Sequence, residues 1–205
     1  MDKTRAQPPQ RTLESPRLRL RHYRDDDVDA LFALQSDLGV MRYWSYPAWT
    51  ERRQAEERLV DIHRQLREDD VYIWVIADRA SDRMIGNTAL FSLDRGQARG
   101  EIGYSLMTDW QGRGLAQEAV RLALAFAFDE LGMERIEADI DPRNAPSRRL
   151  VERLGFVCEG LLRERWRVNG EICDAAFYGL LRREFVAAAG PPARRGTCAS
   201  GTSRA

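Results

Sequence analysis

The chain is poor in the features that mark membrane, secreted and metal-binding proteins. It has no run of about 18 apolar residues, the length that a membrane-spanning helix needs. Its first residues are polar and contain no apolar segment typical of a secretory signal. Only 3 of the 205 residues are cysteine, and they have neither a CxxC spacing nor a paired histidine. We therefore expect a cytoplasmic protein without a membrane partner and without a metal site.

The chain also lacks an excess of charge, because 32 basic residues balance 32 acidic residues. The two signs are unevenly spread: residues 1–24 hold seven basic and two acidic side chains, and residues 187–205 hold three arginines and no acid. The long segment between them is therefore acidic. An acidic body argues against nucleic acid as a partner. It is compatible with a cationic amine substrate, or simply with a solvated surface.

What the chain does contain is a glycine-rich turn between a strand-like segment and an apolar helical run. The turn is residues 110–116, WQGRGLA, and the helical run is residues 117–131. The first amides of a helix have no partner inside the helix, and the helix dipole places partial positive charge there. Glycines allow the backbone to approach a phosphate closely. The segment therefore indicates a site for a phosphorylated ligand, although a tight turn without any ligand would have the same pattern.

Three known phosphate-binding loops can be compared with this turn. A P-loop needs Lys followed by Ser or Thr at the helix start, and Leu115-Ala116 stands there instead. A dinucleotide fingerprint needs a third glycine where this chain has Gln117, although two aspartates follow at about the right distance for a ribose contact. The pattern Gln/Arg-x-x-Gly-x-Gly/Ala does fit, with Gln111, Gly114 and Ala116 at the defined positions.

The fitting pattern resembles the acetyl-CoA pyrophosphate loop of the GNAT superfamily of N-acetyltransferases. Four short motifs follow in order: Arg-Ile-Glu-Ala at 135–138, Asn-x-x-Ser at 144–147, Leu-Gly-Phe at 154–156 and Glu-Gly-x-x-Arg at 159–163. Together they resemble the RimJ/RimL branch, the ribosomal-protein N-acetyltransferases and their relatives, over about residues 16–185. The resemblance implies an α+β GNAT fold with a mixed, mostly antiparallel central sheet flanked by helices.

Composition and periodicity predict one domain, residues 13–186, between a disordered arm (1–12) and a disordered tail (187–205). Strands are expected at 18–23, 71–77, 84–93, 101–107, 134–140, 156–168 and 171–181. Helices are expected around 28–34, from a Thr50 cap to about Glu68, after the glycine turn, and at 144–154. Gly155 would end the last helix, and Asn169-Gly170 would join the last two strands in a type I′ turn.

The resemblance places the acetyl-CoA site at the glycine turn and at groups near it. Backbone amides of the turn would hold the pyrophosphate, with Arg113 either adding charge or lying in solvent. Pantetheine would lie against the end of the preceding strand, and Asn144 would bond to the cofactor arm, cap its own helix, or do both. The expected acetyl-CoA-binding residues are Leu106, Met107, Gln111, Gly112, Arg113, Gly114, Leu115, Ala116 and Asn144.

The implied chemistry is acetyl transfer from acetyl-CoA to a primary amine, which needs a base for the ammonium and an acid for the departing thiolate. Ser147 matches the family position near the thioester sulfur, although it could instead bond to its own helix backbone. Glu101 is the expected base, acting through water, with a plain surface charge as the alternative. Tyr104 and Tyr178 are other possible proton carriers, although a tyrosine in a strand usually serves packing. Some ribosomal members carry Glu after Leu-Gly-Phe where this chain has Trp166, and this departure weakens the ribosomal assignment.

The acceptor pocket is expected to include residues 41–49, an irregular segment with four aromatic residues. Such a segment is either a hydrophobic plug on the sheet or a wall that binds cations through aromatic faces. The expected substrate-binding residues are Tyr43, Trp44, Tyr46 and Trp166. The acceptor would be a protein N-terminal α-amine or a small amine (polyamine, amino acid or aminoglycoside). A non-catalytic acyl-CoA-binding module is the alternative from another functional class.

Overall fold

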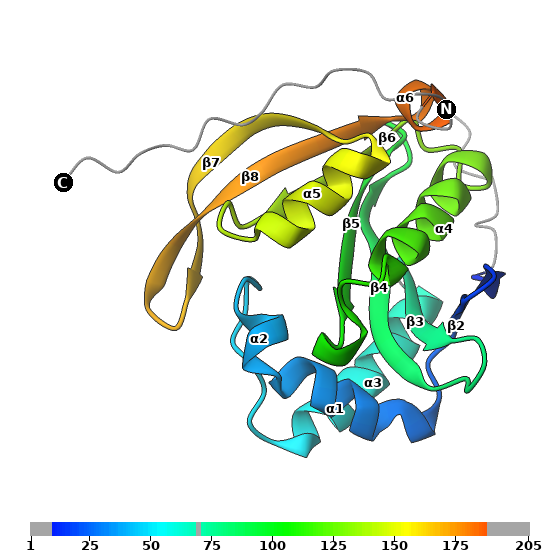
Figure 1. Ribbon diagram of the computed structural model, residues 1–205, viewed down its shortest axis with the longest axis vertical. Coiled ribbons are helices and arrows are strands. Elements are labelled where there is room, and N and C mark those ends of the chain that lie inside the picture. Colours follow the sequence, from blue (N-terminus) through cyan, green and yellow to red (C-terminus); the bar gives the residue numbers. More distant parts are fainter. Residues whose placement is uncertain (1–9, 69–70, 188–205) are drawn as a thin grey trace.

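The computed structural model describes residues 10–68 and 71–187. Its strands are β1 (Leu13–Glu14), β2 (Leu18–Arg21), β3 (Tyr72–Asp78), β4 (Met84–Asp94), β5 (Arg99–Leu106), β6 (Arg135–Ile140), β7 (Val157–Val168) and β8 (Glu171–Leu181). They form one eight-stranded sheet in the order β1-β2-β3-β4-β5-β6-β8-β7 (Figure 1). All neighbours are antiparallel except β5 and β6. The mixed, mostly antiparallel sheet of the expected α+β fold is confirmed.

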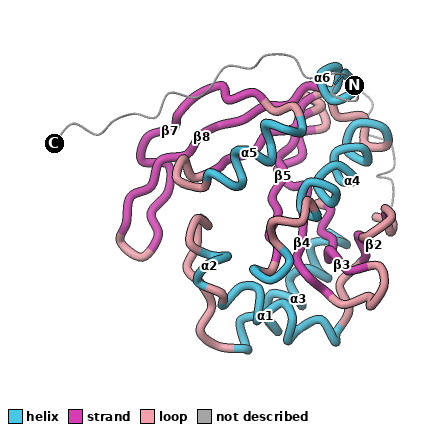
Figure 2. The backbone as a smooth tube through the Cα atoms, viewed as in Figure 1, coloured by secondary structure: helices cyan, strands magenta, loops and turns pink. Residues whose placement is uncertain are grey.

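Helices pack on both faces of this sheet (Figure 2). The longer helices are α1 (Val28–Ser36), α3 (Arg52–Glu68), α4 (Leu115–Asp129) and α5 (Ala145–Leu154), and the short ones are α2 (Leu38–Met41) and α6 (Arg182–Ala187). Successive side chains of a strand point to opposite faces, so β3 is buried on both. Tyr72, Trp74 and Ile76 pack in the cluster that contains α4, and the residues between them pack with α1 and α3. No helix in the described ranges is both long and apolar enough to span a membrane.

The longer strands and helices lie close to where the sequence predicts them, and so do the two turns that depend on glycine. Gly155 ends α5 with φ 114°, in the left-handed region. Asn169 and Gly170, between β7 and β8, both have positive φ, as a type I′ turn requires. The elements that the sequence did not indicate, β1, α2 and α6, are too short to show a hydrophobic period.

The N-terminal boundary of the expected arm needs a correction. The side chain of Gln10 donates to the Ile73 carbonyl at 2.7 Å and accepts from the Ile73 amide at 2.8 Å. The indole of Trp74 donates to the Arg11 carbonyl at 2.9 Å. Residues 10–12 therefore lie along β3, because hydrogen bonds that no hydrophobic pattern reveals hold them there. Residues 1–9 and 188–205 of the expected arm and tail lie outside the described residues, and Ala187 belongs to α6.

The predicted cap of α3 is also different. Thr50 does not cap this helix with its hydroxyl; instead the side-chain oxygen of Gln54 accepts hydrogen bonds from the amides of Thr50 at 2.9 Å and Glu51 at 3.0 Å. A glutamine reaching back from the first turn satisfies the same unpaired donors as a cap residue. Helix α3 begins at Arg52, one residue later than a cap at Thr50 predicts.

Strands β5 and β6 separate soon after they meet. They pair only at Arg99↔Arg135, Gly100↔Ile136 and Glu101↔Glu137. Beyond this point β5 continues along β4 and β6 continues along β8, so the two strands part, as Figure 1 shows. Residues on both parted strands line a common cavity. The parting therefore creates the place where a ligand can enter the sheet.

Candidate active site

The glycine turn forms the N-terminus of α4. Gly112 and Gly114 have φ of 74° and 76°, a left-handed conformation that glycine adopts at little cost, and Gly114 is the N-cap. In the part of the chain that the structure describes, nothing accepts a hydrogen bond from the backbone amides of residues 112–117. Free amides at a helix N-terminus are the groups that bind phosphate. The turn thus presents the donors that an anion needs.

The backbone at the end of β5 makes more hydrogen bonds within the protein than the sequence suggests. The side chain of Gln111 donates to the Leu106 carbonyl at 2.9 Å, and the Met107 amide donates to the Ile85 carbonyl at 2.8 Å. The side chains of Leu106 and Met107 pack in the two hydrophobic clusters. The Met107 amide is therefore not available to pantetheine, because β4 already holds it. Gln111 is placed as a tie between the turn and β5.

Two arginines lie at the turn, and the sequence singled out only one of them. The Arg113 guanidinium lies over the Trp110 ring, 5.5 Å from its centroid, and has no carboxylate partner among the described residues. Arg17 donates from Nη1 to the Arg113 carbonyl at 3.0 Å and from Nε to Glu118 at 2.8 Å. These contacts anchor the turn to the start of β2 and leave the Arg113 guanidinium free of ion pairs. The side chains of Leu115 and Ala116 pack into the core, so these residues offer only their amides.

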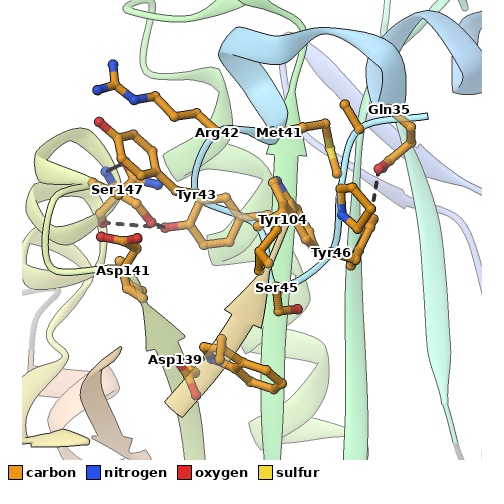
Figure 3. Close-up of a pocket in the computed structure, with 18 of the residues that line it drawn as sticks. Gln35, Met41, Arg42, Tyr43, Ser45, Tyr46, Tyr104, Asp139, Asp141 and Ser147 are labelled. Atoms are coloured by element: carbon orange, nitrogen blue, oxygen red, sulfur yellow. Dashed lines mark hydrogen bonds between the residues drawn. The ribbon is translucent and has the colours of Figure 1, made fainter. Parts of the chain in front are cut away.

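A cavity of about 540 Å³ lies between the parted strands and the segment 41–49 (Figure 3). All four expected substrate-binding residues line it, as do Glu101, Asn144 and Ser147; the four are Tyr43, Trp44, Tyr46 and Trp166. The glycine turn does not line it. The structure therefore separates the expected phosphate site from the expected acceptor site, with the end of β5 between them. Among the described residues, no group of His, Cys, Asp or Glu is arranged to hold a metal ion.

Ser147 and Tyr104 form a hydrogen-bonded pair at the cavity wall. Their hydroxyl oxygens are 2.7 Å apart, and Figure 3 shows the pair reaching from α5 to β5. Asn144 caps α5, because its side-chain oxygen accepts from the Ser147 amide at 3.2 Å. Burial raises the pKa of Tyr104, although the hydrogen bond with Ser147 works against the rise. Sequence reasoning named both hydroxyls separately and did not predict that they form a pair.

Glu101 faces the same cavity from β5, at the last position that pairs with β6. Burial raises the pKa of Glu101; a hydrogen bond with Ser92 works against the rise, and the charges of Glu137 and Asp139 add to it. A carboxylate with a raised pKa is a better base near neutral pH than an ordinary surface carboxylate.

Trp166 is held in the cavity wall by a polar contact that the sequence did not suggest. Its indole donates to Asp139 at 3.2 Å, and Arg165 donates to the other oxygen of the same carboxylate at 3.1 Å. The register of β7 shifts between Leu162 and Trp166, and Glu164 within this bulge has φ 55°. A bulge redirects side chains, which explains why the adjacent Arg165 and Trp166 both reach Asp139.

Comparison with known proteins identifies the family to which this chain is similar. The profile of the acetyltransferase (GNAT) domain family matches residues 17–157. An N-acetyltransferase of Bacillus licheniformis called p20, described as uncharacterized, is 34% identical over 85% of this chain and 98% of its own length. A Bacillus subtilis protein, YdaF, provisionally named a ribosomal N-acetyltransferase, is 35% identical over 50% of this chain and 56% of its own length.

A solved structure agrees with the sequence relatives. The crystal structure of a GCN5-related N-acetyltransferase from Brucella melitensis superposes with a TM-score of 0.76 and 29% identity, covering 88% of this chain and 83% of that one. The chain belongs to the GNAT family of acetyl-CoA-dependent N-acetyltransferases and has RimJ/RimL-like relatives.

Proposed function

We propose that the glycine turn holds the pyrophosphate of acetyl-CoA and that the cavity holds the primary amine to be acetylated. The observation that carries this proposal is the arrangement around the end of β5. Free amides of residues 112–117 lie on one side of it. The cavity with Glu101 and the Tyr104–Ser147 pair lies on the other. A cofactor that crosses between the parted strands would join the two.

The reaction follows from the groups that face the cavity. Glu101, through a water molecule, removes a proton from the ammonium of the acceptor, which frees the nitrogen lone pair. The nitrogen attacks the thioester carbonyl carbon, a new C–N bond forms, and the C–S bond breaks. The departing thiolate takes the proton of the Ser147 hydroxyl, and Tyr104 passes its proton to Ser147 across their hydrogen bond. The attacking nitrogen gives up its second proton, which returns to Tyr104 through water, so that the amide, the CoA thiol and both hydroxyls are neutral at the end. Asn144 uses its oxygen for the cap and keeps its amide hydrogens for the cofactor arm.

Two classes of acceptor suit the cavity. The name of YdaF points to a ribosomal protein, whose N-terminal α-amine would enter with its first residues. The aromatic wall and the carboxylates Glu101 and Asp139 are equally suited to a small amine. Trp166 stands where some ribosomal members carry Glu, which favours the small amine.

The first prediction concerns the turn. Gly114→Val should raise the Kd for acetyl-CoA at least about tenfold, because a β-branched residue is strained at φ 76° and displaces the amides. Gly132→Val is the matched control, since Gly132 has φ 69° beyond the far end of α4. Isothermal titration calorimetry should find its Kd unchanged. Equal losses in the two variants would show that backbone strain, not a phosphate site, explains the effect.

The second prediction concerns the proton donor. Ser147→Ala should lower kcat by about a hundredfold and leave the Kd for acetyl-CoA unchanged, because general-acid catalysis typically contributes about 10²–10⁴ in rate. Tyr104→Phe keeps the serine hydroxyl and removes only its partner, so its loss in kcat should be smaller. Steady-state kinetics at saturating acetyl-CoA measures both. Full activity of Ser147→Ala would remove Ser147 from the mechanism.

The third prediction uses the raised pKa of Glu101. A carboxyl group whose pKa is raised by folding binds protons more tightly in the folded state. It therefore lowers the free energy of unfolding as the pH rises from the pKa of the unfolded chain, near 4.5, through the higher pKa of the folded protein. Glu101→Gln should therefore be more stable than the parent protein at pH 7, and this gain should vanish toward pH 4. The same variant should lose most of kcat at pH 7.

Urea unfolding of parent and variant at several pH values measures this difference. Asp109→Asn, at an exposed carboxylate, is the control and should show no such trend. A stability gain of Glu101→Gln that stays constant with pH would contradict the assignment.

The fourth prediction concerns the acceptor. Release of the CoA thiol should occur with one class among peptides with different N-terminal residues, ribosomal proteins, polyamines, free amino acids and aminoglycosides. Turnover with peptides alone would identify a protein N-terminal acetyltransferase. If acetyl-CoA binds and no amine is acetylated, the proposed acceptor role of the cavity is wrong.

A further inference from the structure

The cavity contains a cation that the acetyl transfer reaction does not use. Arg58 of α3 lines the cavity and is half-buried. Its Nη1 donates to the side-chain oxygen of Gln65 at 2.8 Å. No carboxylate of the described residues pairs with it, whereas Arg52 and Arg53 on the same helix both have acidic partners. A partly buried cation without a counter-ion is unfavourable, so its place in the wall requires an explanation.

Two tyrosines, Tyr23 and Tyr46, line the same cavity as this cation. Tyr23 is 5% exposed, lines the cavity, and accepts a hydrogen bond from Asn87 at 3.1 Å, while its own proton has no acceptor among the described residues. Burial raises the pKa of both Tyr23 and Tyr46, and the positive charge of Arg58, which lines the same cavity, works against both rises. The Tyr23 hydroxyl and the N–H groups of Arg58 other than the one bonded to Gln65 therefore have no acceptor among the described residues.

This part of the cavity is distant from the reacting groups. Figure 3 shows the Tyr104–Ser147 pair at one side of the cavity and the hydrogen bond from Tyr46 to Gln35 at the other. The lining carboxylates belong to β5, β6, β8 and the turn that follows β6, and not to α3; they are Glu101, Asp139, Asp141, Glu171 and Asp174. The cavity thus has carboxylates away from α3 and the half-buried Arg58 on α3, while the other lining arginine, the exposed Arg42, lies on the Ser147 side in Figure 3.

We propose that Arg58, with the hydroxyl of Tyr23, binds a carboxylate of the acceptor. The acceptor then carries an amine that lies at Tyr104 and Ser147 and a carboxylate several bonds away from it. This inference rests on the proposed function, because it uses the same cavity for the amine. Guanidinium recognises carboxylate through two parallel hydrogen bonds, and Nη1 alone is engaged by Gln65.

Kinetics with paired acceptors test the proposal. The probes are aminobutanoate and aminohexanoate, each compared with the unbranched alkylamine of the same length. Arg58→Met should raise KM for the amino acids about tenfold or more, with little change in kcat, in KM for the alkylamines or in KM for acetyl-CoA. Arg58→Lys keeps the charge and should recover part of the loss. Arg53→Met, on the exposed side of the same helix, should behave like the parent protein.

Peptides distinguish the two sources of the carboxylate. A peptide with glutamate as its second residue is compared with the same peptide carrying glutamine. If the enzyme prefers the glutamate peptide to the free amino acids and Arg58→Met loses this preference, the acceptor is an acidic protein N-terminus. If the enzyme prefers the free amino acids, the acceptor is a small amino acid. Equal KM changes for carboxylates and alkylamines would show that Arg58 only shapes the cavity, and no change in either would remove it from acceptor binding. Both results overturn the proposal.

A binding measurement keeps this inference separate from the proposed function. Hexanoate has the carboxylate and lacks the amine, so it can be titrated against the protein without acetyl-CoA while tryptophan fluorescence is followed. Binding that is lost in Arg58→Met supports the carboxylate site even if no amine is acetylated. Binding of hexanoate that is equal in the parent protein and in Arg58→Met overturns it, even if acetyl transfer is confirmed.

Discussion

The separation of β5 from β6 is the constraint on which the rest of the site depends. Two parallel strands that stayed paired would close the sheet and satisfy their own backbone groups. Here pairing ends at Glu101↔Glu137, and beyond it β5 remains paired only with β4 and β6 only with β8. The freed strand edges provide backbone donors and acceptors inside the fold, where an amide-rich cofactor arm can bond. The turn at the end of β5 and the start of α5 after β6 then lie on the two sides of this opening.

The same separation explains how the side chains of the site are held rigidly although some of its polar groups lack hydrogen-bond or ion-pair partners. Tyr104 and Glu101 project from the part of β5 that pairs with β4 without interruption, and Ser147 lies in the first turn of a capped helix. Such supports hold side chains more precisely than loops do. Three features of the site are unfavourable for folding, although most other polar groups are paired. They are the free amides at residues 112–117, the carboxyl group with a raised pKa, and the arginine without a counter-ion. All three lie where ligand groups of opposite character would relieve them.

Sequence reasoning located the parts that local physics determines. The turn at 110–116, the Asn144 cap and the Asn169-Gly170 turn depend on a few adjacent residues, and the structure contains all three. Contacts between distant segments were not predictable from the sequence: Gln10 on β3, Arg17 at the glycine turn, and Trp166 on Asp139. The sequence around Arg58 gives little indication of its role: this arginine lies next to the apolar stripe of α3 and seven residues before a glutamine. Its meaning depends on the cavity, which no single segment of the sequence contains.

The polarity of the cavity also bears on which small amines it can accept. A diamine that places one ammonium at Ser147 would extend its second ammonium toward Arg58. Two like charges about 4 Å apart repel by about 4 kcal/mol at an effective dielectric constant of about 20. The carboxylates that could offset this repulsion are largely engaged, because Asp139 is held by Arg165 and Asp141 by Arg143. A carboxylate in the same place would turn the repulsion into attraction without any rearrangement. With the carboxylate site proposed at Arg58, we expect acceptors that carry both charges to bind more tightly than long polyamines.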